Sequence, residues 1–265
     1  MPQAKTKQTS QLPKTSFWQG ATFPLGVAHR GGDAAGFAKR NTMAAFKSAC
    51  SLGYKYMETD VTLTKDGQVI ISHGSQTALE AYFRGTFSYK KLRGLTYDQV
   101  SQQLRVGGER IPLLSEVLKA FPDTKFFIDP KSDDVVEPLA EILINLNASD
   151  RVFINSFKYH RLMNIQRLLD GKQELGLLIG RHLSLVKKIY RLRIGRLSHL
   201  EAIAVNYWFA TPKRLKLIHK QDLKAIVWTV NSERNIRRAI DNGADVLISD
   251  RTRLLKDIIQ NYTKP

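Results

Sequence analysis

The sequence predicts an α/β protein with one (β/α)8 barrel domain, and three observations support this fold class. Short runs rich in β-branched and aromatic residues alternate with helical patterns along most of the 265 residues, and such alternation is typical of parallel βαβ units. A chain of this length has room for a complete barrel of such units. Several apolar runs end in a charged residue or a histidine, as expected where parallel strands present chemistry at one rim.

The predicted elements follow the chain in order. The segments with strand composition are 25–29, 56–61, 68–73, 125–130, 152–156, 174–179, 202–207, 224–230 and 245–250. The segments with helical spacing are 42–52, 114–120, 135–147, 159–169, 212–220, 232–242 and 252–260. Together they predict strand–helix units that close into a barrel.

Three segments are expected to depart from this regular pattern. A Lys-Asp-Gly turn at 65–67 predicts an antiparallel hairpin in the second unit. Residues 74–113 are long for a βα loop, so we expect them to cover or shape the pocket. Residues 1–20 are polar and basic and are predicted to form a flexible or loosely docked arm. The barrel domain is then expected to span 21–265.

Composition indicates a soluble globular protein, with 43% hydrophobic and 25% charged residues. The single cysteine, Cys50, excludes an internal disulfide framework, and the polar N-terminus has no hydrophobic core of a secretory signal. No apolar run reaches the roughly 18 residues of a membrane span. We therefore expect a cytoplasmic location, with peripheral membrane contact as an option.

The net charge of +17 is expected to attract anions such as nucleic acid, acidic lipid or phosphorylated metabolites. Cations and apolar residues alternate most densely over 181–196, a pattern that suits a basic helix on an anionic membrane. An outer barrel helix with a solvated basic face explains the same pattern and is the preferred interpretation. No specific nucleic-acid partner is expected, and the oligomeric state is left open.

Carboxylates and histidines at the strand ends indicate the chemistry. Glu58 and Asp60 are two positions apart on one strand, so their side chains face the same way. A hard divalent cation, Mg²⁺ or Ca²⁺, relieves the repulsion of such a pair, and Asp129 is a candidate third ligand. Ion pairs with neighbouring lysines or arginines are the alternative for Glu58 and Asp60. His29 and His73 have the residue type to carry protons near neutral pH.

Two cations are candidate phosphate ligands. Arg30 offers a planar fork of donors and Lys131 a compact charge, and both would offset negative charge in a transition state. Histidines, acids and cations in this combination suit metal-assisted cleavage of a phosphate ester.

Taken in order, these residues resemble the glycerophosphodiester phosphodiesterase family. The resemblance runs from AHRGG through METDVTLTKDGQVIISH and FIDPK to VWTVN and covers about residues 25 to 260. It implies a (β/α)8 barrel that hydrolyses glycerophosphodiesters to glycerol 3-phosphate and an alcohol with one divalent cation. It also implies these roles: His29 and His73 as the acid/base pair, Arg30 and Lys131 as phosphate ligands, Glu58, Asp60 and Asp129 as metal ligands, and Trp228 as a pocket wall.

The chain departs from the family pattern at three places. Arg40 replaces the glutamate of a Pro-Glu-Asn-Thr motif, Gly74 replaces an aspartate after the second histidine, and Asp129 replaces a glutamate. We expect Arg40 either to weaken metal binding or to contact a second anionic group. The core residue types remain competent, so an active enzyme is expected. A lipid-directed phospholipase D of the lysophospholipase D or sphingomyelinase D type, and a non-catalytic anion- or membrane-binding barrel, are the alternatives.

Overall fold

Eight parallel strands close into a barrel in the computed structural model, which describes residues 17–75, 86–171, 173–179 and 199–262. The strands are β1 (Leu25–His29), β2 (Tyr56–Leu63), β6 (Lys125–Pro130), β7 (Val152–Ser156), β8 (Leu175–Ile179), β9 (Leu200–Asn206), β10 (Lys224–Trp228) and β11 (Val246–Ser249). Strand β1 pairs with both β2 and β11, and this closes the sheet. The predicted fold class is therefore confirmed.

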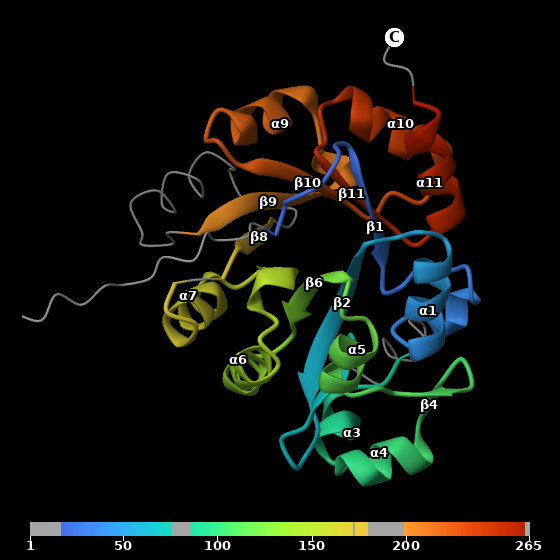
Figure 1. The fold of residues 1–265 in the computed structure, drawn as a ribbon, viewed down its shortest axis with the longest axis vertical. Coiled ribbons are helices and arrows are strands. Elements are labelled where there is room, and N and C mark those ends of the chain that lie inside the picture. Colours follow the sequence, from blue (N-terminus) through green and yellow to red (C-terminus); the bar gives the residue numbers. More distant parts are fainter. Residues whose placement is uncertain (1–16, 76–85, 172, 180–198, 263–265) are drawn as a thin grey trace, which may run out of the picture.

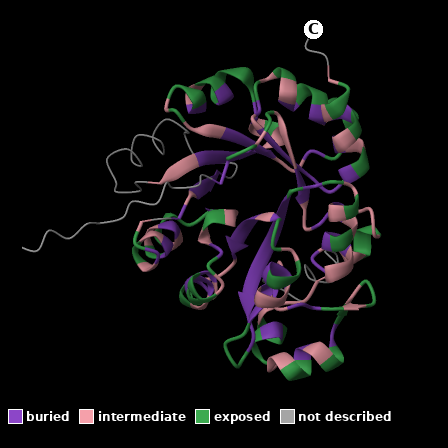
Figure 2. Ribbon diagram, viewed as in Figure 1, coloured by how far each residue is buried: buried purple, intermediate pink, exposed green. Residues whose placement is uncertain are grey.

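Helices enclose the strands, as Figure 1 shows, and each predicted helix is present. They are α1 (Met43–Ser51), α5 (Leu114–Ala120), α6 (Val136–Asn145), α7 (Tyr159–Leu168), α9 (Pro212–His219), α10 (Glu233–Asp241) and α11 (Thr252–Gln260). Local sequence sets their starts: the hydroxyls of Thr42 and Ser232 cap α1 and α10, and Pro212 fits the first turn of α9. Their apolar faces pack against the strands, so their exposed residues face outward (Figure 2).

The barrel interior changes from apolar to polar along the strands. Inward positions near the strand starts carry Val27, Tyr56, Phe127 and related side chains in one buried cluster. Because strand side chains alternate between faces, the inward positions that follow are occupied by His29, Glu58 or Asp129. The two-residue period therefore builds an apolar floor beneath a charged upper layer.

Phe17 and Trp18 complete that floor. Both are buried, and Phe17 packs against the rings of Tyr56, Phe127 and Phe153. The Phe17 carbonyl accepts a hydrogen bond from Lys125 Nζ at 2.6 Å. The prediction of a flexible arm over 1–20 is therefore wrong for Phe17 and Trp18, because their rings fill the barrel interior. Residues 1–16 lie outside the described residues.

The long segment after β2 forms a small folded extension. Strand β3 (Val69–Ile71) pairs antiparallel with β2, which confirms the predicted hairpin. The extension continues with α3 (Tyr89–Arg93), α4 (Tyr97–Gln103), β4 (Arg105–Val106) and β5 (Glu109–Arg110). Figure 1 shows α3, α4 and β4 gathered at one end of the molecule, near α5.

Two sequence predictions concern membranes. The basic segment 181–196 lies outside the described residues. In the part of the chain that is described, none of the helices has the length and apolar character needed to cross a membrane.

Candidate active site

A cavity of about 900 Å³ opens at the carboxyl ends of the barrel strands. Its lining includes all eight residues singled out from the sequence: His29, Arg30, Glu58, Asp60, His73, Asp129, Lys131 and Trp228. Strand β2 supplies Glu58 and Asp60, and the register places Glu58 beside His29 of β1 and Asp60 beside Asp129 of β6. The extension contributes Thr86, Phe87, Arg105, Val106 and Gly107 to the same wall, so the expectation that 74–113 shapes the pocket is confirmed for these residues.

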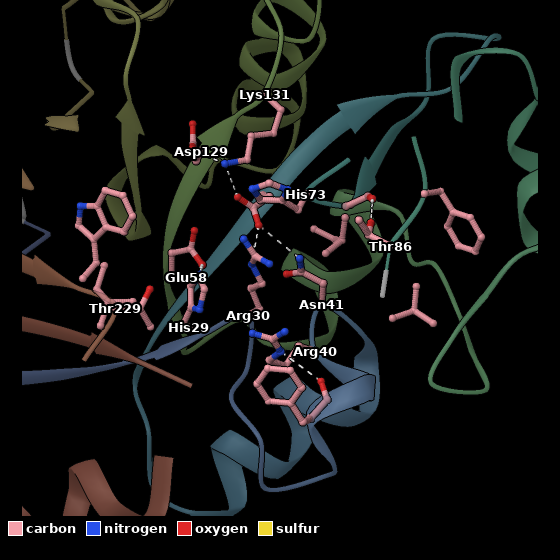
Figure 3. Close-up of a pocket in the computed structure, with 18 of the residues that line it drawn as sticks. His29, Arg30, Arg40, Asn41, Glu58, His73, Thr86, Asp129, Lys131 and Thr229 are labelled. Carbon is pink, nitrogen blue, oxygen red and sulfur yellow. Dashed lines mark hydrogen bonds and ion pairs between the residues drawn. The ribbon is translucent and has the colours of Figure 1, made fainter. Parts of the chain in front are cut away.

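Asp60 is the most heavily paired carboxylate of the cavity. Arg30 Nε lies 2.9 Å from Asp60 Oδ2, and Lys131 Nζ lies 2.6 Å from Asp60 Oδ1. Asn41 Nδ2 donates a longer hydrogen bond to Asp60 at 3.4 Å. Dashed lines from Arg30, Lys131 and Asn41 in Figure 3 mark these three contacts. Burial alone would raise the pKa of Asp60, but Arg30 and Lys131 outweigh that effect and hold the pKa well below its usual range.

Lys131 also bridges to the neighbouring carboxylate, with Nζ 2.6 Å from Asp129 Oδ2. Burial nevertheless raises the pKa of Asp129. Glu58 differs, because its Oε2 is buried without a hydrogen-bond partner among the described residues. Burial and the charge of Asp60 raise the pKa of Glu58 well above its usual range, which marks Glu58 as a carboxylate short of positive charge.

The predicted metal ligands share the cavity but do not converge on one point. No three His, Cys, Asp or Glu side chains of the described residues are arranged to hold a metal ion together. The physical reason is Lys131, whose ammonium lies between Asp60 and Asp129. The unpartnered oxygen of Glu58 nevertheless suits a hard cation, since an oxygen without a donor is costly when buried.

His29 is held by an acid that sequence reasoning missed. Its Nδ1 lies 2.7 Å from Asp250 Oδ1, at the end of β11. Asn231 Nδ2 donates to the other oxygen of Asp250 at 2.7 Å. Burial and the charge of Arg30 lower the pKa of His29, while Asp250 opposes this shift. Because Asp250 accepts at Nδ1, Nε2 is free to face the cavity and Glu58, whose Oε2 is 3.6 Å away.

Arg40 reinforces the same acid. Its Nη1 lies 2.5 Å from Asp250 Oδ1, and its guanidinium carbon lies 3.6 Å from the centre of the Phe37 ring. The sequence left two roles open for this departure from the family pattern. The structure pairs Arg40 with the same Asp250 oxygen that contacts His29, and the two roles stay predictions.

His73 has a different environment. Its Nδ1 lies 2.6 Å from the Gly74 carbonyl oxygen, so Nδ1 carries the proton and donates. Burial lowers the pKa of His73 to about 4, with the charges of Lys131 and Arg30 adding to the effect. Gly74 has φ +61°, and an added Cβ would lie 2.2 Å from the ring of Tyr89. The ring of Tyr89 therefore explains why glycine, and not aspartate, follows this histidine.

The backbone after β1 explains the two glycines of HRGG. Arg30 adopts a left-handed conformation at φ +55°, which is uncommon for a residue with a side chain and recurs at functional sites. Gly32 follows at φ +77°, and a Cβ there would lie 2.1 Å from Thr252 Cγ2. Gly31 is limited in the same way, because a Cβ there would lie 2.8 Å from the Ala45 carbonyl carbon.

Aromatic side chains form the outer wall of the cavity, namely Phe37, Phe87, Phe157 and Trp228. Two buried polar atoms in this wall, Asn155 Oδ1 and Trp228 Nε1, have no hydrogen-bond partner among the described residues. They are an acceptor and a donor available to a polar ligand.

Comparisons with known proteins find relatives in sequence and in fold. The family model described as "Glycerophosphoryl diester phosphodiesterase family" matches residues 29–254. A glycerophosphodiester phosphodiesterase of Caldanaerobacter subterraneus is 28% identical over 251 residues, covering 89% of this chain and 98% of the relative. A lysophospholipase D of Rattus norvegicus is 27% identical over 278 residues, covering 89% and 86% respectively. An Oleispira antarctica phosphodiesterase, solved with sn-glycerol 3-phosphate, has a TM-score of 0.73 and 20% identity, covering 90% of this chain and 98% of that one.

Proposed function

The chain belongs to the glycerophosphoryl diester phosphodiesterase family, and from this premise we propose that it hydrolyses glycerophosphodiesters to glycerol 3-phosphate and an alcohol. It is a phosphoric diester hydrolase. One observation carries the proposal: two imidazoles, three acids and two cations of the predicted set line a single cavity at the catalytic end of the barrel.

Arg30 and Lys131 are the proposed ligands of the phosphodiester. Both reach Asp60, and burial makes their charges strong because little water screens them. The bonds to Asp60 fix the two cations in place before substrate arrives. Such preorganised cations stabilise the negative charge that builds on the phosphoryl oxygens during cleavage.

We assign the base role to His73 and the acid role to His29. His73 is neutral at pH 7, since burial lowers its pKa to about 4, and its bond to the Gly74 carbonyl leaves Nε2 free to accept a proton. His29 is the imidazole whose charged form has a carboxylate partner, Asp250. The negative phosphodiester raises the pKa of His29 on binding, so His29 can take up the proton that it later gives to the leaving alcohol.

A divalent cation, Mg²⁺ or Ca²⁺, is proposed at Glu58, Asp60 and Asp129. When bound, it would polarise the phosphoryl oxygens and neutralise charge that the side chains leave uncompensated. Without it, three cations (Arg30, Arg40 and Lys131) face four acids (Glu58, Asp60, Asp129 and Asp250). Burial, together with the charges of Asp60 and Asp129, raises the pKa of Glu58. Cation binding requires Lys131 to release at least one carboxylate.

Trp228 and Asn155 are proposed to contact the glycerol hydroxyls. Trp228 Nε1 is a donor, Asn155 Oδ1 is an acceptor, and both are buried without partners among the described residues. A substrate hydroxyl that satisfies each atom removes the cost of burying it alone.

The test is release of glycerol 3-phosphate from glycerophosphocholine in the presence of Mg²⁺ or Ca²⁺. His29→Ala and Glu58→Ala should each lose at least about 100-fold in kcat, the usual worth of an acid/base group or a metal contact. His219→Ala is the matched control, because His219 pairs with Asp245 away from the cavity. Near wild-type rates in both site variants would refute the assignment.

A lysophospholipase D activity is the second candidate. The cavity of about 900 Å³ lies at the upper end of the range for small-molecule sites, and its aromatic wall suits an acyl chain. A curated relative is named lysophospholipase D. Comparing kcat/KM for lysophosphatidylcholine and glycerophosphocholine decides between the substrates, and absence of turnover on both would favour the non-catalytic alternative.

A further inference from the structure

Exposed aromatic side chains gather at the catalytic end of the barrel. The described residues include six large hydrophobic side chains that are exposed: Phe23, Phe37, Ile144, Phe157, Tyr159 and Trp208. Four of them follow the carboxyl ends of strands, Phe37 after β1, Phe157 and Tyr159 after β7, and Trp208 after β9. Phe23 precedes β1 and Ile144 lies near the end of α6, so both belong to the opposite end of the barrel.

These aromatic residues are spread around the mouth and do not form one local cluster. Strands β1, β7 and β9 are separated from one another by other strands in the closed sheet. Trp208 is 67% exposed and Phe37 is 57% exposed, although both are large enough to stabilise a core if buried. Phe37 and Phe157 also line the cavity, so the apolar surface continues from the rim into the site.

The same rim carries unpaired positive charge. Four of its solvent-facing acids are matched by a cation: Asp33 by Arg251, Asp133 by Arg161, Asp134 by Arg93 and Glu233 by Arg237. Glu137, in the first turn of α6, is exposed and forms no ion pair with any described residue. Four further exposed cations, Lys158, Lys213, Arg234 and Arg253, form no ion pair with any described residue. The rim surface is therefore both aromatic and net positive.

We propose that this aromatic and cationic rim docks on an anionic lipid bilayer, with the active-site mouth facing the bilayer. The rim is defined by Phe37, Phe157, Tyr159, Trp208, Lys158, Lys213, Arg234 and Arg253. Aromatic side chains favour the boundary between lipid headgroups and acyl chains, and unpaired cations are attracted to acidic lipid. Charge complementarity selects the partner, because a neutral bilayer would leave the four cations without counter-charge. The proposal stands on exposure and charge and does not depend on the reaction proposed above.

Sedimentation with vesicles tests the docking. The full chain should bind vesicles of equal parts phosphatidylcholine and phosphatidylglycerol and should not bind phosphatidylcholine alone. The double variant Lys158→Gln/Lys213→Gln should bind the anionic vesicles about 25-fold more weakly, since each surface cation contributes about a factor of five. The matched control is Lys216→Gln/Lys220→Gln, an equal charge change further along α9 and toward the opposite end of the barrel.

Two aromatic variants test the orientation. Trp208→Ser should weaken vesicle binding, whereas Ile144→Ser, an exposed apolar residue at the opposite end, should leave it unchanged. Tryptophan emission should shift to shorter wavelength on binding in the wild type and much less in Trp208→Phe, because a bilayer removes water from an exposed indole.

Three results would overturn the proposal. The first is no binding to anionic vesicles. The second is equal loss in the two double-lysine variants, which would mean unspecific attraction by the net charge of +17. The third is an emission shift of Trp208 with duplex DNA and none with vesicles. Turnover of water-soluble glycerophosphocholine, measured in parallel, reports on the reaction separately and should be the same in all these variants.

Discussion

Asp250→Asn is the sharpest test of how His29 is controlled. The carboxylate of Asp250 contacts His29 Nδ1 at 2.7 Å and Arg40 Nη1 at 2.5 Å, and Asn231 Nδ2 donates to its other oxygen. The substitution keeps the size of the side chain and removes its charge. His29 then loses its charged partner, and the partly buried Arg40 is left beside a neutral amide.

The magnitude follows from the bond that is lost. A hydrogen bond to a charged group is worth about 1.5–3 kcal/mol, and about 1.4 kcal/mol corresponds to tenfold in rate. We therefore expect kcat to fall about ten- to a hundredfold. Asp250 raises the pKa of His29, so its removal lowers that pKa. If His29 acts as the acid, the alkaline limb of the kcat/KM profile must move to lower pH.

The assay is glycerol 3-phosphate release from glycerophosphocholine across the pH range, with thermal unfolding of each variant to verify folding. Asp257→Asn is the matched control, since Asp257 is exposed on α11. A folded Asp250→Asn enzyme with kcat within about twofold of wild type, and an unmoved alkaline limb, would refute this role for Asp250.

Four further predictions concern stability and the cation. Phe17→Ala should lower the free energy of unfolding, measured in urea, by about 3–5 kcal/mol, as for other large cavities. A decrease below about 1 kcal/mol would contradict the packing of Phe17 in the barrel floor. Gly74→Ala should cost about 1–3 kcal/mol, because its Cβ would lie 2.2 Å from the Tyr89 ring, and this cost should shrink in the Tyr89→Ala background. When the pH falls from 6.5 to 4 in the presence of chelator, the free energy of unfolding should decrease by about 3 kcal/mol more in wild type than in His73→Gln. The unfolded histidine binds a proton in that window and the folded one, with its pKa of about 4, does not. Chelator should abolish turnover, and Mg²⁺ or Ca²⁺ at a hundredfold excess over Kd should stabilise wild type by about 2.7 kcal/mol, an effect absent from Glu58→Gln.

Much of the fold and the cavity could be predicted because they depend on local periodicity. Glu58 and Asp60 had to share a face of their strand, and parallel pairing then placed Asp60 beside Asp129. Asp250 comes at the end of β11, as Asp129 comes at the end of β6. Treating acids at the ends of all strands as candidates, including the last strand, would therefore have identified Asp250 as a site residue.

Other contacts join residues that are far apart in sequence. Asp250 and His29 are 221 positions apart, and nothing in the local sequence predicts that Arg40 pairs with the same carboxylate. The arm prediction failed at Phe17 for a related reason. The residues next to Phe17 in sequence are polar and basic, so they do not indicate burial. The rings that Phe17 packs against, Phe127 and Phe153, lie more than a hundred residues later in the chain.

The position of Phe17 also decides where this domain can be cut. The family model matches from residue 29, whereas Phe17 is already part of the buried interior of the described residues. A truncation guided by the aligned region alone would remove β1 with the ring beneath it and admit water to the bottom of the barrel. A fusion partner placed before Phe17 must likewise be joined by a linker long enough for Phe17 to reach the barrel interior. The smallest unit that folds on its own is therefore longer than the region matched by the family model.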